Sequence, residues 1–500
     1  MGVKNSCFPL GLFTRGLICD RPIAVMIKKL LSCCSLLLLS MNAASAAAKP
    51  NIIIIYADDL GYGDLSCYGA TKIKTPNIDN LASESMMFTD AHAPASLCSP
   101  SRYGLMMGSS PWRLHKKGNG YRLSPEQTNM GSFLQKNGYR TAAIGKWHLG
   151  YSKNWNKLPI TGPLEVGFDY HFGVPSNHND STRAFIENND IVGRKEGEAY
   201  KIIKGRDFPE GLAEPRIEDQ VDTVLTAKAV KFIERNAKTP FFLYFTPCAP
   251  HTHVTPAAEF RGTSAAGLYG DHVQELDSHV GTILKTLDRL KLRENTLVIF
   301  TSDNGSTPKD FKGSQNTVLN LADDSGDIRE KFKTAKKDAK GLGHVTNGPW
   351  RDGKGYSYEG GHRVPCIVNW PGKIKAGTSS DYTFNLTDIF ATTAEIIEVP
   401  LPEHSAEDSI SLLPVLHGKP APKREAIFIQ GNGKDSAIAV CTGRWKLIVR
   451  TVEEGAKAYE LYDLDVDKGE TNNVTEANPE VTKKLAAALV KAEEDGRTRL

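Results

Sequence analysis

The sequence predicts an α/β protein with a large, mostly parallel or mixed sheet flanked by helices, followed by a smaller C-terminal domain of antiparallel sheet plus helix. Two continuous apolar runs rich in β-branched residues, 51–56 and 296–301, have the composition of strands buried on both faces. Amphipathic segments alternate with such runs, which is typical of a parallel sheet covered by helices. Beyond a proline-rich stretch near residue 400, short successive strand patterns indicate the second domain.

The first 46 residues are predicted to stand apart from both domains. Residues 1–25 show no coherent pattern, whereas residues 26–46 combine a basic start, an apolar core and an Ala-Ser-Ala end, as in a bacterial secretory signal. The apolar core is too short for a stable membrane span, so we expect a secreted or periplasmic protein. Residues 1–46 hold five basic side chains and one acidic side chain, so without them the formal net charge of +3 becomes −1. That charge argues against nucleic-acid binding.

Acidic and amide side chains follow both predicted buried strands. Asp58 and Asp59 come after the run 51–56, and Asp303 and Asn304 come after the run 296–301. Parallel strands end at the same edge of a sheet, where open α/β proteins bind their ligands. Adjacent carboxylates need a counter-charge, and oxygen ligands suit Ca²⁺ or Mg²⁺ better than Zn²⁺. Turn or capping chemistry would explain either pair alone, but the two pairs together favour a divalent-cation site.

A cysteine, a proline and an arginine mark the predicted start of a helix at residues 98–108. Pro100 can occupy the first turn because its missing N–H and fixed φ cost nothing there. Cys98 then lies beside a helix N-terminus, which favours an anion. Arg102 follows one turn later with a planar guanidinium that suits a tetrahedral oxyanion. Taken alone, this pattern is equally consistent with a buried cysteine on an ordinary capped helix.

A short apolar strand is predicted at residues 141–144, with a tight turn at Gly145. If the strand persists, Lys146 and His148 point to the same side because they are two residues apart. Lys146 is a fixed cation, and His148 can carry a proton near neutral pH. A lone pair of this kind would more often be a solvated strand end.

The clearest predicted helix covers residues 271–292, where apolar residues recur at three- and four-residue spacing. Residues 306–347 contain few large apolar side chains and are interpreted as a solvated insertion in preference to a flap over the pocket. Prolines between 400 and 422 place the domain boundary, giving a catalytic domain at 49–400 and a smaller domain at 401–500. The smaller domain is predicted to contain strands at 426–430, 437–441 and 445–449 and a helix from Pro479. The five cysteines after the signal lack metal-ligand spacing and are expected to be mostly free, buried thiols.

Several segments together resemble the formylglycine-dependent sulfatases of the arylsulfatase type, within the alkaline phosphatase superfamily. The resemblance extends approximately from residue 50 to residue 475, and the segments that carry it are 61–69, 98–108, 138–148, 353–361 and 461–472. It implies an alkaline phosphatase-like fold and an enzyme that hydrolyses a sulfate ester to an alcohol and inorganic sulfate. A sulfated glycan or an aryl sulfate is the expected substrate.

The resemblance also implies roles for individual residues. Cys98 would be oxidised to formylglycine by a formylglycine-generating or anaerobic maturation enzyme, and the hydrated aldehyde would supply the nucleophile. The residues implied to hold one divalent cation, Ca²⁺ in preference to Mg²⁺, are Asp58, Asp59, Asp303, Asn304 and modified Cys98. The residues implied to surround the sulfate and move protons are Arg102, Lys146, His148, Lys354 and one of His251 and His253.

The chain departs from the family pattern at two substrate-binding positions. His253 is favoured for the catalytic contact and His251 is kept as the alternative, because Thr255 before Pro256 blurs the register. Asn177 is expected to replace an active-site serine. The alternatives to a sulfatase are a phosphonate or phosphodiester hydrolase of the same superfamily and, more remotely, an inactive carbohydrate-binding protein.

Overall fold

The computed structural model describes residues 49–115, 120–152, 157–178, 183–195, 216–307, 342–422, 424–431, 437–452 and 455–499. The predicted N-terminal extension and signal at 1–46 and most of the segment 306–347 lie outside the described residues. Residues 49–500 form one compact unit, and their division into two domains at residue 400 stays a prediction. No helix among the described residues combines the length and apolarity that crossing a membrane requires.

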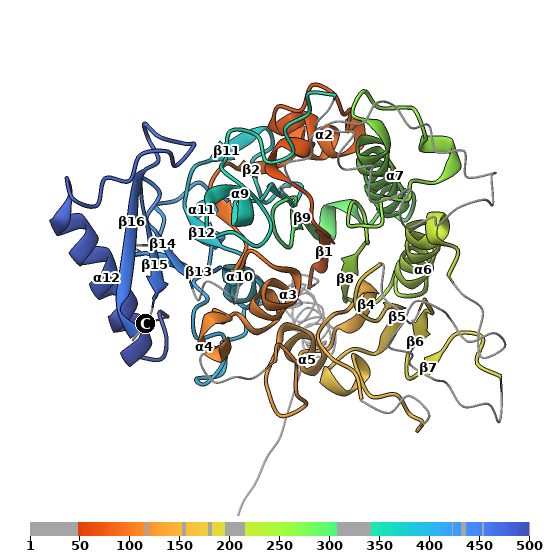
Figure 1. Ribbon diagram of the computed structural model, residues 1–500. Helices are drawn as coiled ribbons and strands as arrows, with labels where there is room; N and C mark the ends of the chain where they lie inside the picture. Colours follow the sequence, from red (N-terminus) through yellow and green to blue (C-terminus); the bar gives the residue numbers. More distant parts are fainter. Residues whose placement is uncertain are drawn as a thin grey trace, which may run out of the picture. The chain divides into compact units, whose positions relative to one another are not determined.

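The predicted α/β class is confirmed by a ten-stranded mixed sheet with the strand order β11-β2-β10-β9-β1-β8-β4-β5-β6-β7 (Figure 1). Its central strands run parallel to one another: β9 (Thr296–Ser302), β1 (Asn51–Ala57), β8 (Phe241–Thr246), β4 (Arg140–Lys146) and β5 (Tyr170–Val174). Antiparallel pairs join the outer strands on both sides: β10 (Cys366–Asn369), β2 (Met86–Phe88), β6 (Ile186–Glu187) and β7 (Asp190–Ile191). At the edge opposite β7, the strand β11 (Thr378–Ser380) pairs parallel with β2.

Two apolar cores fill the two faces of this sheet. In β1, Ile52 and Ile54 pack into one core and Ile53 and Ile55 into the other, as the two-residue period of a strand requires. One core includes residues of α3 (Cys98–Met107), α5 (Met130–Lys136) and α10 (Asp388–Ile396). The other includes residues of α2 (Pro76–Ser83), α6 (Val221–Arg235) and α7 (Gly267–Arg289), which lie together in Figure 1. The predicted helix 271–292 therefore exists as α7, with both ends shifted toward the N-terminus.

A second, antiparallel sheet lies in the C-terminal part of the chain. It consists of β13 (Ile427–Gln430), β14 (Ile438–Cys441), β15 (Trp445–Thr451) and β16 (Lys457–Asp463). Leu485 and Leu489 of α12 (Pro479–Glu494) pack in one apolar cluster with Val440 and Leu447 of this sheet. The three predicted strands and the terminal helix are thus confirmed, whereas the sequence analysis missed β16. Most residues of β16 are not buried, so the strand lacks a clear apolar pattern.

The remaining elements are short and connect or cap the larger ones. They are η1 (Tyr62–Asp64), η2 (Ser66–Tyr68), β3 (Ala91–His92), α4 (Trp112–His115), η3 (Leu164–Val166), η4 (Glu218–Gln220), η5 (Ala258–Phe260), η6 (Arg293–Asn295), α9 (Glu359–His362), β12 (Phe384–Asn385) and α11 (Leu413–Leu416). The five cysteines among the described residues are all free, and four of them are buried, as expected from the sequence.

Candidate active site

The acidic residues meet because β1 and β9 are parallel neighbours in register, with Ala57 paired to Ser302. The next residues of each strand therefore emerge side by side at the carboxyl edge of the sheet. The backbone N–H of Asp59 donates to Asp303 Oδ1 at 3.1 Å, and Asn304 Nδ2 donates to Asp59 Oδ1 at 2.9 Å. Asp58, Asp59, Asp303 and Asn304 are all buried. The structure thus brings together the four side chains that the sequence analysis assigned to a cation.

Cys98 is the first residue of α3, as predicted, and its thiol faces the same acidic group. Its Sγ lies 3.8 Å from Asp59 Oδ1 and 3.1 Å from the ammonium of Lys354. The same ammonium donates to Asp59 Oδ1 at 2.6 Å. Burial raises the pKa of the Cys98 thiol to about 12, although Lys146 and Lys354 oppose that shift.

Two buried cations hold the remaining carboxylates. Arg102 contacts Asp303 Oδ2 through Nε at 2.9 Å and through Nη2 at 2.8 Å. Lys146 Nζ contacts the two oxygens of Asp58 at 2.8 Å and 2.9 Å, with both side chains fully buried. Burial alone would lower the pKa of Lys146, but the Asp58 carboxylate, together with Cys98 and Asp303, raises that pKa overall. The three aspartates therefore face three cations, the third being Lys354, and the group is formally neutral.

His148 reaches the site by a turn and not by continuation of the strand. β4 ends at Lys146, and His148 has a φ of 57°, so the predicted same-side geometry of the two residues does not apply. Burial first, and then the charges of Lys146 and Arg102, lower the pKa of His148 to about 2, so its imidazole is neutral. Its Nδ1 is buried and has no hydrogen-bond partner among the described residues.

Gly145 lies within β4 and not in the tight turn that the sequence analysis predicted. It has a φ of 120°, and a Cβ at this position would lie 2.0 Å from the carbonyl oxygen of Thr246. A close approach of two backbones therefore requires glycine here.

The two neighbouring histidines have different partners. His251 Nε2 lies 3.8 Å from Asp59 Oδ2, and ligand atoms of His251, Asp58, Asp59 and Cys98 all lie within 4.8 Å of one another. His253 Nδ1 lies 3.3 Å from Oε2 of Glu218. His251, the alternative in the sequence analysis, therefore lies beside the acidic group.

Asn177 follows β5 and leaves its Oδ1 buried without a hydrogen-bond partner among the described residues. An acceptor in this state is suited to a donor supplied by a ligand.

Three residues near the site were not found from the sequence. Thr307 Oγ1 donates to Asp59 Oδ2 at 3.4 Å. Tyr56 and Tyr244 lie on β1 and β8 with ring centroids 6.1 Å apart, and the guanidinium carbon of Arg102 lies 5.4 Å from the Tyr56 centroid. For the two tyrosines a signal was available, because each lies near the end of an otherwise apolar strand and a buried hydroxyl needs a polar neighbour.

The donor set of the acidic group fits a hard divalent cation. Three carboxylates and one amide supply oxygen atoms, which Ca²⁺ and Mg²⁺ prefer. Asn304 Oδ1 is buried and has no hydrogen-bond partner among the described residues, so it is free to be a ligand. The three aspartates and three cations of the site are neutral together, so they would not offset the +2 charge of a bound cation.

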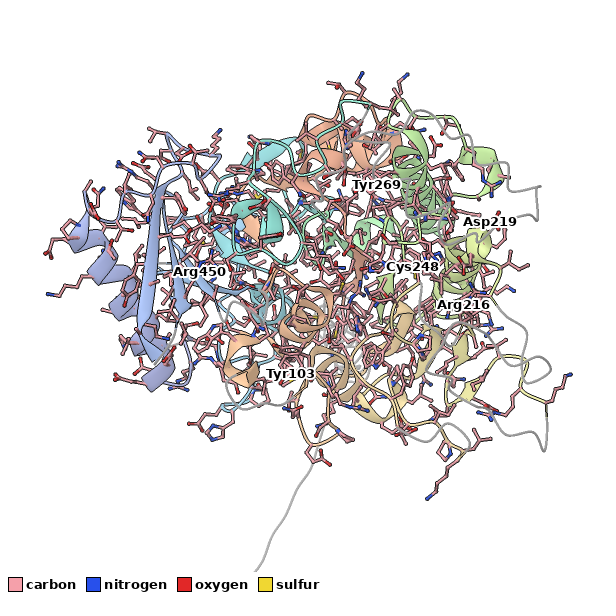
Figure 2. All side chains as sticks on the ribbon, in the orientation of Figure 1. Tyr103, Arg216, Asp219, Cys248, Tyr269 and Arg450 are labelled. Carbon is pink, nitrogen blue, oxygen red and sulfur yellow. The ribbon has the colours of Figure 1, made fainter. Side chains whose placement is uncertain are left out.

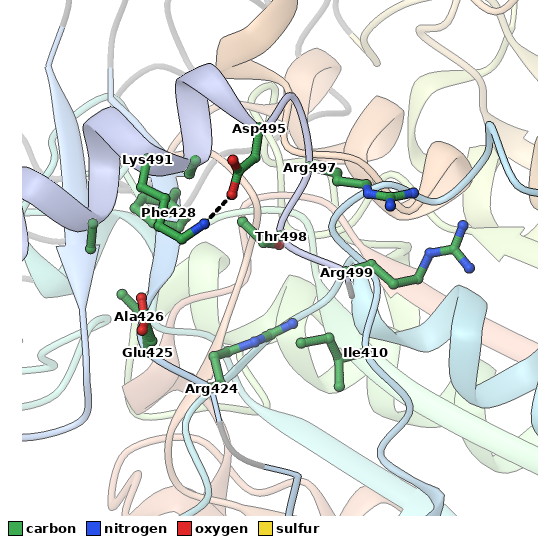
Figure 3. A pocket seen from close by; sticks show the side chains of 12 residues that line it. Ile410, Arg424, Glu425, Ala426, Phe428, Lys491, Asp495, Arg497, Thr498 and Arg499 are labelled. Carbon is green, nitrogen blue, oxygen red and sulfur yellow. Dashed lines mark hydrogen bonds and ion pairs between the residues drawn. The ribbon is translucent and has the colours of Figure 1, made fainter.

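A separate cavity of about 610 Å³ lies at the C-terminal part of the chain (Figure 3). Arg424, Lys491 and Arg499 line it, but Arg424 pairs with Asp388, Lys491 pairs with Asp495, and Arg499 donates to the carbonyl of Ser405. None of the predicted catalytic residues lines this cavity. These three cations already have protein partners, so they give no reason to place the reaction there.

Comparison with known proteins adds independent evidence. A family model described as "Sulfatase" matches residues 50–399, and a model of the C-terminal part of N-sulphoglucosamine sulphohydrolase matches residues 349–495. The N-acetylgalactosamine-6-O-sulfatase of Bacteroides thetaiotaomicron is 34% identical over 496 residues, covering 88% of this chain and 92% of the relative. The human N-acetylgalactosamine-6-sulfatase is 32% identical over 428 residues, covering 81% of this chain and 72% of the relative.

The fold comparison agrees. A solved structure described under glycosaminoglycan metabolism by Bacteroides thetaiotaomicron superposes with a TM-score of 0.77 at 34% identity. The match covers 90% of this chain and 100% of the solved one.

Proposed function

The chain belongs to the sulfatase family and is a sulfuric ester hydrolase, and from this premise we propose that it removes sulfate from a sulfated glycan at Cys98. The observation that carries the proposal is the meeting of Cys98, Asp59 and Lys354. One ammonium lies 2.6 Å from the carboxylate and 3.1 Å from the sulfur. The comparisons favour this function over a phosphonate or phosphodiester hydrolase and over an inactive carbohydrate-binding protein.

We assign the cation to Asp58, Asp59, Asp303, Asn304 and position 98, and we propose Ca²⁺, with Mg²⁺ as the alternative. A bound divalent cation supplies Lewis acidity, which lowers the pKa of a hydroxyl and stabilises charge on sulfuryl oxygens. The Asn304 Oδ1 atom without a partner supports this assignment.

We propose that Cys98 is converted to formylglycine by a maturation enzyme. The hydrated aldehyde supplies one hydroxyl as nucleophile and a second whose ionisation allows sulfate to leave. A side chain with a single nucleophilic atom, such as a thiol, offers no second hydroxyl. The position of Cys98 at the N-terminus of α3 supports an anionic reaction centre, because the helix dipole favours negative charge there.

The surrounding residues divide the remaining tasks. Lys146, Arg102 and Lys354 present positive charge to the sulfuryl oxygens, in a buried site where such charge is most effective. Asp303 accepts a proton from the attacking hydroxyl. Lys354 or His253 gives a proton to the departing alcohol. His148 is neutral, and a neutral imidazole can accept the proton whose removal lets sulfate leave. His251 and Asn177 contact the substrate.

For the substrate we propose a 6-O-sulfated N-acetylgalactosamine residue in a glycan. The two N-acetylgalactosamine-6-sulfatases, at 34% and 32% identity, support this choice. We also propose that residues 26–46 direct export, so that the enzyme meets its substrate outside the cell or in the periplasm. Residues 49–400 are proposed to form the catalytic domain.

The test uses the full chain co-expressed with a formylglycine-generating enzyme. Sulfate release is measured by ion chromatography from 4-nitrophenyl sulfate and from 6-O-sulfated N-acetylgalactosamine, with bis(4-nitrophenyl) phosphate as the competing substrate. We expect sulfate release by the wild-type chain and none by Cys98→Ala, and peptide mass spectrometry should show the aldehyde at position 98. A preference for the phosphodiester, or equal activity of Cys98→Ala, would contradict the proposal.

A further inference from the structure

A carboxylate without an assigned role lies behind His253. Glu218 opens the short helix η4, directly before α6, and its Oε2 lies 3.3 Å from Nδ1 of His253. Its Oε1 lies 3.2 Å from Nη2 of Arg183. The side chains of His253 and Glu218 are only 9% and 16% exposed, so this contact is largely shielded from water.

The backbone around Glu218 is tied to the histidine loop. Thr255 Oγ1 donates to the carbonyl oxygen of Glu218 at 3.2 Å and lies 2.8 Å from His178 Nε2. Arg216 donates to the carbonyl oxygens of His178 and Ala184 at 3.0 Å and 2.7 Å. Arg216 and Asp219, on either side of Glu218 in the sequence, are labelled beside α6 in Figure 2. Glu218 therefore approaches His253 from a fixed scaffold.

Glu218 is a stable anion in this setting. Burial alone would raise its pKa, but the hydrogen bond with His253 and the electrostatic interactions with His178, His253 and Arg183 together lower it to about 2. A carboxylate accepts a hydrogen bond from the imidazole Nδ1–H, which fixes the orientation of the ring and directs Nε2 to the opposite side.

His253 lies close in sequence to a residue of the reaction centre. His253 lies two residues after His251, whose Nε2 is 3.8 Å from Asp59. Two residues span at most about 7 Å of chain, which places the backbone of His253 near that of His251. His253 itself is buried.

We propose that Glu218 is a positioning residue that holds His253 with Nδ1 toward itself and Nε2 toward the oxygen that leaves from the sulfate ester. This inference rests on the proposed function of the same site. As the bond between sulfur and the leaving oxygen breaks and a new bond forms between sulfur and the nucleophile at position 98, the leaving oxygen takes the proton from Nε2. Glu218 stabilises the positive imidazole before the transfer, and Arg183 keeps the carboxylate in place.

The proposal predicts a loss that depends on the leaving group. Phenols such as 4-nitrophenol leave without a proton, whereas a sugar alcohol needs one, and a positioned acid contributes about 10²–10⁴-fold to rate. For Glu218→Gln we expect a fall in kcat/KM of less than about tenfold with 4-nitrophenyl sulfate and of at least about 100-fold with 6-O-sulfated N-acetylgalactosamine. Across a series of aryl sulfates, the rate of the variant should fall more steeply with leaving-group pKa than that of the wild type.

The neighbouring residue offers a matched control. Asp219 is the next carboxylate in the same turn, and it pairs with Nη2 of Arg261 at 2.6 Å. Asp219→Asn should follow the wild-type leaving-group dependence. Glu218→Asp keeps the charge but shortens the side chain, so its kcat/KM with the sugar substrate should be intermediate between those of the wild type and Glu218→Gln. This second variant also tests the proposal if Glu218→Gln does not fold. Thermal melting of each variant identifies folding defects.

A loss of equal size for every leaving group in both Glu218 variants would overturn the proposal, and so would the same selective loss in Asp219→Asn. These outcomes differ from failure of the proposed function, in which the wild-type enzyme releases sulfate from none of the substrates.

Discussion

Replacing Lys146 by methionine tests how the buried charges and the proposed cation depend on one another. The ammonium contacts both oxygens of Asp58 at 2.8 Å and 2.9 Å, and neither side chain is exposed. Lys146→Met keeps the length of the side chain and removes its charge. Asp58 then retains Nη2 of Arg102, which is 3.7 Å away and already contacts Asp303 at 2.8 Å.

The expected magnitude follows from the loss of a buried partner. Breaking a fully buried ion pair costs about 3–5 kcal/mol, because the remaining charge is left without compensation. The residual contact with Arg102 places our expectation near the lower limit, at about 3 kcal/mol of unfolding free energy in the presence of EDTA. A cation bound by Asp58 would replace the missing charge, so saturating Ca²⁺ should stabilise the variant more than the wild type. The difference in unfolding free energy between the two proteins should therefore be smaller with Ca²⁺ than with EDTA.

The measurement is urea denaturation of both proteins with EDTA and with Ca²⁺. Lys228→Met is the control, since Lys228 pairs with Glu187 at 2.8 Å and both side chains are partly exposed. Such an exposed pair contributes about 0–1 kcal/mol, and its loss should not depend on Ca²⁺. A Lys146→Met difference below about 1 kcal/mol in EDTA, or one that Ca²⁺ leaves unchanged, would refute the reasoning.

Three further predictions address the nucleophile, the buried charges and the backbone. Cys98→Ser has no second hydroxyl on the side-chain carbon, so turnover should fall by at least about 10³-fold and mass spectrometry should detect sulfate retained at position 98; full turnover would contradict this. Burial raises the pKa of Glu470 to about 7 despite the opposing charge of Lys446, so the folded protein binds more protons and its unfolding free energy falls from pH 4.5 to pH 7, by up to about 3 kcal/mol. Glu470→Gln should remove that part of the pH dependence of the unfolding free energy measured by urea denaturation. If the variant and the wild type instead show the same change in unfolding free energy with pH, Glu470 is not its source. Gly305→Ala places a Cβ 1.8 Å from the carbonyl oxygen of Gly360, which must displace the loop that carries Asn304. We expect at least about tenfold weaker Ca²⁺ binding in calorimetry, and unchanged binding would show that the loop adapts.

The elements that the sequence predicts well are those whose pattern reflects local burial. The strands β1 and β9 are buried on both faces and are therefore continuous apolar runs. The start of α7 was misplaced because Gly267–Gly270 looks like a loop in sequence, although Tyr269 is fully buried there. β16 is an edge strand with few buried residues, so tertiary pairing with β15 decides its conformation.

In the site, too, some features follow from the local sequence pattern and others depend on contacts between distant segments. Asp58 and Asp303 could be placed together because parallel strands end at one edge of a sheet. The conformation of His148 and the partner of His253 depend on contacts between segments that are distant in sequence. Glu218 lies 35 residues before His253, in a short turn without any periodic pattern, and sequence reasoning had no signal to connect them.

The burial of Cys98 has a consequence for when the proposed modification can take place relative to folding. Only 5% of this residue is exposed, and the rest of α3 from Pro100 to Met107 is buried around it. If Cys98 is oxidised as we propose, the oxidising enzyme has to reach the sulfur before the chain has folded, during or soon after synthesis. On this proposal, molecules that fold with an unmodified Cys98 would stay inactive, and later addition of the oxidising enzyme would not restore their activity unless they were first unfolded.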